Sequence, residues 1–439
     1  MFKKSFIMVL IILLFSNVCV LAEIPSYPED RGVLLYEVNS DQMIIEHNID
    51  KKFYPASTTK IMTAILVVEY LFLEQQITVG SEISSIPSYS STAELQEGEV
   101  LKVEELLYAL MLPSGNDAAN VFAVQVARKV SGNQSLHIEN ALAYFASLMN
   151  QKAKDLGASH THFLNPHGLH HPNHYTTPED MLKITKELLM HDILKKVIQT
   201  TEYHVTSNKQ THDWYNTNVF LQERWDDIPH ADRKGINIYY NTKVDGIKTG
   251  TTTPAGRCVI FSSHNGNLDL IGIIYHSTLE ELWQEGTDLM NYAFDNYAYV
   301  NFTYENKEVE KIYISNGKNG DSTLSVISRE ELALLVEKES EDNILMKTSY
   351  IDKFQPYKEG YEITGDISKN DRIGTVQYYI NGEVVVETAL YASHDMQKRT
   401  FYDFLFRWYS ILLILLLFIG IQIMRVQNKR RKKRKIQRR

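Results

Sequence analysis

YPASTTKIM, residues 54–62, is the segment around which this 439-residue chain is built. Pro55 and its small neighbours end an extended segment, and a helical pattern then runs from about Ser57 to Leu71. Ser57 is therefore expected at a helix N-terminus, where unpaired N–H groups favour a developing negative charge. Lys60 follows three residues later, so its amine is expected one turn along the same face.

The Ser57–Lys60 spacing suggests a nucleophile and its base. A serine hydroxyl is a weak nucleophile until another group takes its proton, and a lysine amine does so only when it is neutral. Burial and a second cation nearby would both lower the pKa of Lys60. The spacing alone is weak evidence, because Ser315 and Lys318 share it in a Gly/Asn turn without a helix. A helix cap beside a solvated lysine is the commoner meaning of Ser-x-x-Lys.

A second motif, Ser114-Gly115-Asn116, lies in the break between two expected helices, directly after Pro113. A hydroxyl and an amide on such a turn can reach into a cleft. Ser114 would relay a proton between Lys60 and a leaving amine, and Asn116 would hydrogen-bond the substrate. Because the same triplet recurs at residues 131–133, a simple helix cap stays the alternative.

The third motif, Lys248-Thr249-Gly250, ends an expected strand that begins at Val244. Gly250 lets a substrate backbone approach the strand closely. Lys248 would supply the second cation that lowers the pKa of Lys60, and Thr249 can bind a terminal carboxylate. Backbone N–H groups of Ser57 and Thr251 could then form an oxyanion hole.

The two ends of the chain differ from its middle. Residues 1–22 indicate a signal peptide, with two lysines, an apolar run and a small-residue cleavage site. Residues 408–424 carry no charge and reach the lower limit for a transmembrane helix. Residues 425–439 form a basic tail of ten Lys and Arg without an acid. The localisation expected from this pattern is the cell membrane, single-pass, with the C-terminus cytoplasmic and the main body extracellular.

The exported part, residues 23–424, is acidic. It holds 33 Lys and Arg against 54 Asp and Glu, a net charge of −21, which argues against nucleic acid as a partner. Cys258 is the one cysteine left after removal of the signal peptide, so no intrachain disulfide is expected.

Hydrophobic periodicity divides the exported part into two regions. Residues 23–297 predict a hairpin at 32–46, helices at 103–112, 116–130, 136–156, 178–190 and 279–294, and strands at 236–240, 244–249, 257–263 and 268–276. This order describes a mixed sheet covered by helices. Residues 298–395 predict a small all-β domain of short strands, and residues 396–407 a linker to the membrane.

In this order, Ser-x-x-Lys, Ser-x-Asn and Lys-Thr-Gly are the combination that marks penicillin-binding proteins and class A β-lactamases. The chain resembles the low-molecular-mass penicillin-binding proteins of the D-alanyl-D-alanine carboxypeptidase family. The resemblance is strong over about residues 30–295 and looser over about 300–395. It rests on residues 54–64, 113–119, 165–169, 244–256 and 369–382.

The resemblance implies an α/β (mixed) penicillin-binding/β-lactamase-like transpeptidase fold: a mainly antiparallel sheet covered by helices with a helical subdomain, a small all-β domain and a C-terminal transmembrane helix. It implies a hydrolase, a serine-type D-Ala-D-Ala carboxypeptidase of cell-wall peptidoglycan biosynthesis and cell shape, with Ser57 acylated and Lys60 its base. The partners would be a peptidoglycan pentapeptide ending in D-Ala-D-Ala, β-lactams as covalent inhibitors and the cytoplasmic membrane, with no cofactor. Arg233, fifteen residues before Lys248, looks like the family's carboxylate-binding arginine.

Two features depart from the family pattern. The family often associates with lipid through an amphipathic helix, whereas this chain is expected to carry a true membrane span followed by a basic tail. Thr251 stands where many relatives have a histidine or an aromatic residue. Because only its backbone is needed, the expected chemistry survives.

Alternative functions are also compatible with the sequence. A β-lactamase needs a carboxylate to activate water, and Thr161 stands where its Glu-x-x-Leu-Asn signature has that acid. A metal could bind the six histidines between His160 and His174, although Pro166, Gly168 and Pro172 make this segment a loop. A catalytically silent wall-binding or sensor protein is a third alternative, and transpeptidation is a fourth. No Gly-x-Ser-x-Gly motif is present, which disfavours an α/β-hydrolase.

Overall fold

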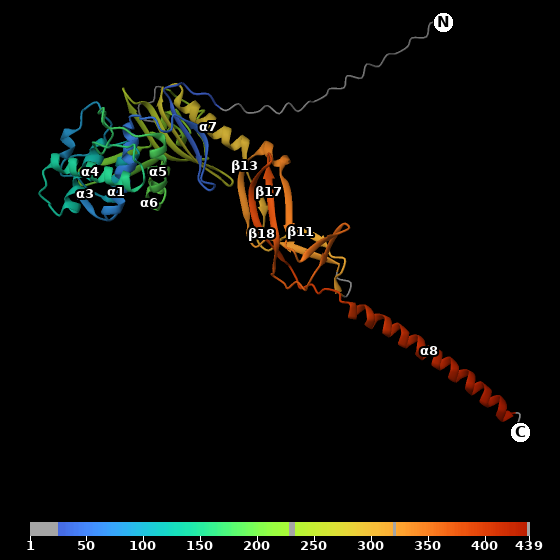
Figure 1. The fold of residues 1–439 in the computed structure, drawn as a ribbon. Coiled ribbons are helices and arrows are strands. Elements are labelled where there is room, and N and C mark those ends of the chain that lie inside the picture. The colour runs from blue at the N-terminus through green and yellow to red at the C-terminus, as the bar shows by residue number, and fades with distance from the viewer. Residues whose placement is uncertain (1–24, 228–232, 319–321, 437–439) are drawn as a thin grey trace, which may run out of the picture. The chain divides into compact units, whose positions relative to one another are not determined.

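The computed structural model describes residues 25–227, 233–318 and 322–436 (Figure 1). The expected signal peptide at residues 1–22 lies outside this described part. The chain divides into two compact units, Met1–Ala298 and Tyr299–Arg439, each of which is described by itself.

The first unit is built on a five-stranded antiparallel sheet of order β2-β1-β9-β8-β7. Its strands are β1 (Gly32–Glu37), β2 (Gln42–His47), β7 (Val244–Thr252), β8 (Gly256–Asn265) and β9 (Leu268–Ser277). β7 ends the sheet order and has β8 as its one neighbour in it. Since a strand at such an edge offers backbone N–H and C=O groups on its open side, β7 can receive a further extended chain.

Helices and short hairpins precede and follow these strands. The helices are η1 (Ala56–Thr59), α1 (Lys60–Tyr70), η2 (Ser81–Ser85), α2 (Val103–Met111), α3 (Asn116–Ser131), α4 (Ile138–Asp155), α5 (Pro178–Leu188), α6 (Asp192–Gln199), η3 (Val219–Leu221), η4 (Trp225–Asp227) and α7 (Leu282–Asn296). The hairpins pair β3 (Gln76–Thr78) with β4 (Val100–Lys102), and β5 (Glu202–Thr206) with β6 (Thr211–Tyr215).

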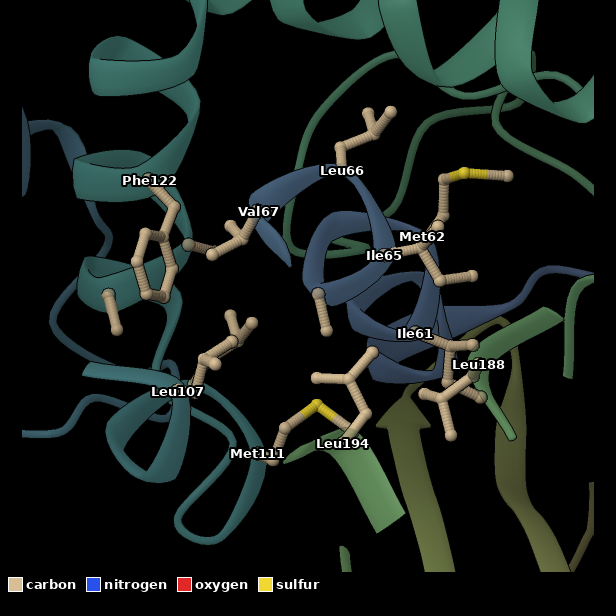
Figure 2. Packing of buried hydrophobic residues seen from close by; sticks show 14 of the residues in the cluster. Ile61, Met62, Ile65, Leu66, Val67, Leu107, Met111, Phe122, Leu188 and Leu194 are labelled. Atoms are coloured by element: carbon tan, nitrogen blue, oxygen red, sulfur yellow. The ribbon is translucent and has the colours of Figure 1, made fainter. Parts of the chain in front are cut away.

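Helix α1 lies in the middle of the core. Every residue from Lys60 to Val67 is buried, and Figure 2 shows its side chains among residues of neighbouring helices. Between Ile61 and Val68 the helix is apolar except at Thr63, whose hydroxyl donates to the Pro166 carbonyl oxygen, as expected for a helix largely surrounded by protein. One consequence is that the Lys60 side chain is fully buried at the start of this helix.

The sheet is buried on both faces. Leu34 and Tyr36 of β1 belong to the core that contains α1. Their neighbours along the strand, Val33 and Leu35, are also fully buried and point to the opposite face, because side chains alternate along a strand. On that second face Phe261 of β8 meets Phe220 edge-to-face. Cys258 of β8 is fully buried in the α1 core.

The sequence predictions for this unit are confirmed for the first hairpin, for the six predicted helices and for the last three strands, with ends shifted by a few residues. The helix predicted from Ser57 is observed as η1 followed by α1. The strand predicted at residues 236–240 is wrong. Ile236 makes one isolated bridge, to Arg224, and turns follow. Ile236 and Ile238 are exposed, so their alternation does not reflect a buried strand face. α6 and the β5–β6 hairpin were not foreseen.

The second unit is rich in strands, as predicted. A five-stranded sheet has the order β11-β12-β18-β17-β14, and two further pairs join β10 to β13 and β15 to β16. The strands are β10 (Tyr297–Thr303), β11 (Glu308–Tyr313), β12 (Thr323–Ile327), β13 (Leu332–Glu337), β14 (Leu345–Tyr350), β15 (Phe354–Tyr357), β16 (Gly360–Ile363), β17 (Arg372–Ile380) and β18 (Glu383–Ala392).

Helix α8 (Phe401–Ile436) follows the strands of the second unit. It begins inside the segment expected to be a linker and continues into the basic tail. Within the described residues it is the one helix long and apolar enough to cross a membrane.

Candidate active site

The three sequence motifs meet in one cleft of the first unit, with a volume of about 770 Å³. Ser57 comes from the turn before α1, Ser114 and Asn116 from the start of α3, and Thr249, Gly250 and Thr251 from the edge strand β7. The loop that precedes α5 adds His167 and Gly168.

The Lys60 amine is fixed by three oxygen atoms. Its Nζ lies 3.0 Å from Ser57 Oγ, 2.6 Å from Asn116 Oδ1 and 3.0 Å from the His167 carbonyl oxygen. The amide and carbonyl oxygens can only accept hydrogen bonds. A neutral amine therefore gives its two N–H groups to Asn116 and His167, and its lone pair faces the Ser57 hydroxyl. This arrangement is that of a base poised to take the serine proton.

Burial keeps this amine neutral. Lys60 is fully buried, and this burial, followed by the charge of Lys248, holds the pKa of Lys60 well below its usual range. Lys248 is itself buried, which lowers its pKa to about 7. The two lysines thus oppose each other's protonation because like charges in a low-dielectric environment repel.

Two residues of the site have left-handed backbone conformations without being glycine. Ala56, directly before the nucleophile, has φ 47°, and Ser114 has φ 61°. Such conformations are uncommon for non-glycine residues and cluster at functional sites. The loop before α5 supports the first of them: Gly168 has φ +88°, and a Cβ there would lie 1.7 Å from the Ala56 carbonyl oxygen. Only glycine allows this close approach below the nucleophile.

The Ser114 hydroxyl makes no hydrogen bond to the described part of the protein. Ser114 is buried, and its Oγ has no hydrogen-bond partner among the described residues. The neighbouring Asp117 fixes this part of the chain by accepting hydrogen bonds from the N–H groups of Ala93 and Leu95. A held but unsatisfied hydroxyl beside the Ser57–Lys60 pair is suited to exchange protons with a bound substrate.

The edge strand passes close to the nucleophile at Gly250. A Cβ at this position would lie 3.0 Å from the Pro55 carbonyl oxygen and 3.1 Å from the Ser57 nitrogen. Thr249 Oγ1 lies 2.6 Å from Thr217 Oγ1, and Thr251 lines the cleft. The backbone of Ser57 and the strand that carries Thr251 therefore lie side by side, as an oxyanion hole between them requires.

The two arginines of this region lie in different places. Arg233 is exposed and packs over the Trp225 ring, 5.1 Å from its centroid, and it is not among the cleft-lining residues. Arg257 does line the cleft. Sequence reasoning missed Arg257, although its place on the strand after the Lys-Thr-Gly strand, opposite Thr251 in a hairpin, was a usable signal.

His174 of the histidine-rich loop makes two hydrogen bonds inside the protein. His174 Nδ1 accepts the Leu164 N–H, so its Nε2 carries the proton and donates to Thr59 Oγ1 at 2.9 Å. Burial lowers the pKa of His174 to about 3, which keeps the ring neutral. The ring thereby ties the loop to the turn that carries Ser57.

One group of three potential metal ligands occurs in the described part of the chain, and it lies elsewhere: Glu69, Glu187 and His191. Lys152 already bridges the two carboxylates. A cation would have to displace this ammonium group.

Among the described residues that line the cleft, no carboxylate stands where a β-lactamase would need one. None of the described residues that line it is Asp or Glu. Thr161 hydrogen-bonds Thr176 Oγ1 at 2.8 Å and Asp180 Oδ2 at 2.9 Å. The acid needed for fast hydrolysis of a penicilloyl group is absent from these lining residues.

The coupling of the two lysines predicts a pH effect. Acylation of Ser57 is expected to slow as the pH falls, because protonation of Lys60 removes the base. In Lys248→Gln the repelling charge is lost, the pKa of Lys60 rises, and the acidic limb of the rate profile moves to higher pH. The measurement is the second-order rate of labelling by a fluorescent penicillin between about pH 5 and about pH 9.

The matched control for this experiment is Lys347→Gln, an exposed lysine of the second unit, which leaves the profile in place. An acidic limb that moves to lower pH in Lys248→Gln, or that does not move, would contradict the coupling.

Comparison with known sequences agrees with this geometry. The family described as D-alanyl-D-alanine carboxypeptidase, Peptidase S11, matches residues 28–278. The family described as penicillin-binding protein 5, C-terminal domain, matches residues 297–398.

Several relatives match most of the chain, among them the following two. D-alanyl-D-alanine carboxypeptidase DacF of Bacillus subtilis is 28% identical over 386 residues, covering 86% of this chain and 89% of DacF. D-alanyl-D-alanine carboxypeptidase DacC of Escherichia coli is 26% identical over 390 residues, covering 87% of each.

Solved structures share the fold. Penicillin-binding protein 5 from Haemophilus influenzae aligns with a TM-score of 0.57 at 23% identity, over 85% of this chain and 99% of that one. The Streptomyces K15 DD-transpeptidase aligns with a TM-score of 0.53 at 27% identity, over 60% of this chain and 96% of that one. The first likeness supports the fold of both units, and the second that of the unit with the cleft.

Proposed function

The chain belongs to the D-alanyl-D-alanine carboxypeptidase family, and from this premise we propose that it removes the terminal D-alanine from peptidoglycan stem pentapeptides through an acyl-enzyme on Ser57. The observation that carries the proposal is the Lys60 amine, 3.0 Å from the Ser57 hydroxyl, with its other two partners restricted to accepting hydrogen bonds. A base held next to a hydroxyl group is needed for nucleophilic catalysis, whereas a catalytically inactive binding protein does not need one.

In the acylation step, Ser57 Oγ attacks the carbonyl carbon of the penultimate D-alanine while Lys60 Nζ takes its proton. The N–H groups of Ser57 and Thr251 stabilise the oxyanion that forms. The C–N bond then breaks, and the leaving D-alanine amine receives a proton from Lys60 through the Ser114 hydroxyl. Lys60 is neutral again when the free D-alanine departs, and Ser57 carries the ester.

Deacylation uses the same base. A water molecule attacks the ester carbonyl, Lys60 accepts its proton, and the Ser57 oxygen leaves as a hydroxyl group. A penicilloyl ester blocks this water by keeping its leaving group tethered in the cleft. Because the described cleft-lining residues include no carboxylate, such an ester is long-lived, and β-lactams act as covalent inhibitors.

The membrane placement is part of the proposal. The signal peptide at residues 1–22 directs export, and the apolar part of α8, followed by ten basic residues, forms a single span with its basic end in the cytoplasm. The catalytic domain, residues 23–297, and the β domain, residues 298–395, are then outside, where peptidoglycan is made.

The decisive experiment is D-alanine release from diacetyl-Lys-D-Ala-D-Ala by the full chain in detergent micelles. One free D-alanine is expected per peptide cleaved, and none from the peptide ending in L-Ala. Absence of release together with covalent penicillin labelling would contradict the carboxypeptidase proposal. Transfer of the acyl group to an added D-amino acid, measured in the same reaction, gives the share of transpeptidation.

A further inference from the structure

Within the described residues, the five-stranded sheet of the second unit is open along β14. The sheet order places β14 at one end and β11 at the other. The β11 end is continued by a bridge from Ile314 to Tyr361 of β16, and the Ser315 N–H donates to the Tyr361 carbonyl oxygen. By contrast, β14 has β17 as its one neighbour in the sheet order. An open strand edge presents backbone N–H and C=O groups that can pair with another extended chain.

The backbone groups of Met346, Thr348 and Tyr350 face the open side of β14. The Ile351 N–H donates to the Ile373 carbonyl oxygen of β17, and the hydrogen-bonding direction alternates along a strand. Because β14 pairs with β17 without a bulge, its odd-numbered residues bond to β17 and its even-numbered residues point outward. The described residues provide no hydrogen bond to these outward backbone groups.

β14 is complementary to a second copy of itself when the two strands run antiparallel about Thr348. A twofold axis perpendicular to the sheet at Thr348 makes the two Thr348 residues a hydrogen-bonded pair and sets Leu345 of each copy opposite Ile351 of the other. Leu345 is 66% exposed and Ile351 39%, so their contact removes apolar surface from water. An axis at Lys347 would place two lysines opposite each other, which is destabilising.

The charges at the two ends of the strand favour the same register. β14 follows η6 (Lys338–Asn343), whose last turn carries the exposed acids Glu341 and Asp342. Lys353 lies beyond the other end of β14, is exposed, and has a backbone carbonyl oxygen as the partner of its amine. Pairing about Thr348 brings Lys353 of each copy to the acidic end of η6 in the other, so opposite charges meet twice in each pair.

We propose that two copies of this chain associate in the membrane by pairing their β14 strands antiparallel about Thr348, which joins their sheets into one. A single strand pair is small beside the about 1,200–2,000 Å² buried in stable complexes. The confinement of both copies to one bilayer by α8 therefore supplies the effective concentration that the contact needs. The inference uses the proposed membrane placement and is independent of the reaction at Ser57.

Disulfide trapping tests the register directly. The full chain with Cys19→Ala is reconstituted in vesicles of phosphatidylethanolamine and phosphatidylglycerol and oxidised; Cys258 is fully buried and does not compete. Thr348→Cys is expected to give a covalent dimer, because the Cα atoms of a hydrogen-bonded pair lie about 5.5 Å apart, within the reach of a disulfide. Lys347→Cys and Ser349→Cys are the matched controls. Each lies two residues out of register with its own copy, about 8 Å away, and is expected not to crosslink.

A second experiment removes the association without removing the sheet. A mixture of Leu345→Cys and Ile351→Cys chains of different tag lengths is expected to crosslink as a heterodimer. Adding Thr348→Pro to both chains is expected to abolish this product, because proline lacks the outward N–H, whereas the bonds to β17 stay and an edge strand tolerates proline. Thermal unfolding and penicillin labelling of the Thr348→Pro chain are expected to match those of the wild type.

Three outcomes would overturn the proposal. Equal crosslinking of Thr348→Cys, Lys347→Cys and Ser349→Cys would mean random collision in the bilayer, and strongest crosslinking of either control would mean another register. A Thr348→Cys chain that stays monomeric would mean that the edge is free or is taken by a different partner. A heterodimer that persists undiminished with Thr348→Pro would show that the backbone of β14 does not hold the two copies together.

Discussion

Ser57→Ala is expected to abolish D-alanine release and covalent penicillin labelling, with a loss on the order of 10⁴-fold or more. Without the Oγ atom no ester can form, and the remaining groups of the cleft can only bind the peptide. Intact-protein mass spectrometry after incubation with penicillin measures the effect directly. The wild type gains the mass of one penicillin, and the variant gains none.

The chain supplies a matched control in Ser315, which has a lysine three residues later but lies outside the cleft. Its Oγ donates to Glu362 at 3.3 Å in the second unit. Ser315→Ala is expected to label at the wild-type rate. A penicillin adduct on Ser57→Ala, located by peptide mapping, would show that another residue is the nucleophile.

Lys60→Met is expected to slow acylation about 10²- to 10⁴-fold, the range for loss of a general base. Methionine fills much of the same apolar space but cannot accept a proton. The variant also removes the donor for Asn116 Oδ1 and the His167 carbonyl oxygen, which costs about 1–3 kcal/mol of stability for each oxygen left unpaired. The measurement is the second-order rate constant of penicillin labelling, with the unfolding temperature determined in parallel.

The pH profile distinguishes loss of a base from loss of structure. Lys60→Met should lack the acidic limb that the wild type shows, because the titrating group is gone. Lys318→Met, the other lysine of a Ser-x-x-Lys spacing, should keep both rate and limb. A labelling rate for Lys60→Met within about tenfold of the wild type would mean that another group takes the Ser57 proton.

Secondary-structure elements could be predicted from the sequence where the hydrophobic periodicity and the position of a catalytic motif indicate the same element. α1 could be recognised because Ile61, Ile65, Val68 and Leu71 recur at helical spacing, and β7 because its strand pattern ends at Gly250, the glycine that passes close to Ser57. The Ser57–Lys60–Lys248 arrangement follows from these two elements. By contrast, the alternation at Ile236 and Ile238 imitates a strand, although both side chains are exposed. Periodicity alone cannot report whether a partner strand is present.

Arg257 is the clearest example of a cleft-lining residue that the sequence analysis did not single out. Arg233 was singled out by its distance along the chain from Lys248, whereas the cleft is lined by Arg257. What brings Arg257 there is the register of the β7–β8 hairpin, which pairs it with Thr251. Register depends on the tight turn between the strands, and a one-residue slip would point the side chain to the other face.

Cys258, the neighbour of Arg257, allows transient opening of this edge of the sheet to be measured. Its thiol is fully buried, and burial raises its pKa to about 12, so it is inert in the closed protein. A maleimide reagent can modify it only in molecules whose β7–β8 edge has transiently come apart. The rate of modification, followed before and after a penicillin occupies Ser57, would count how often that edge separates and how far the covalent inhibitor suppresses it.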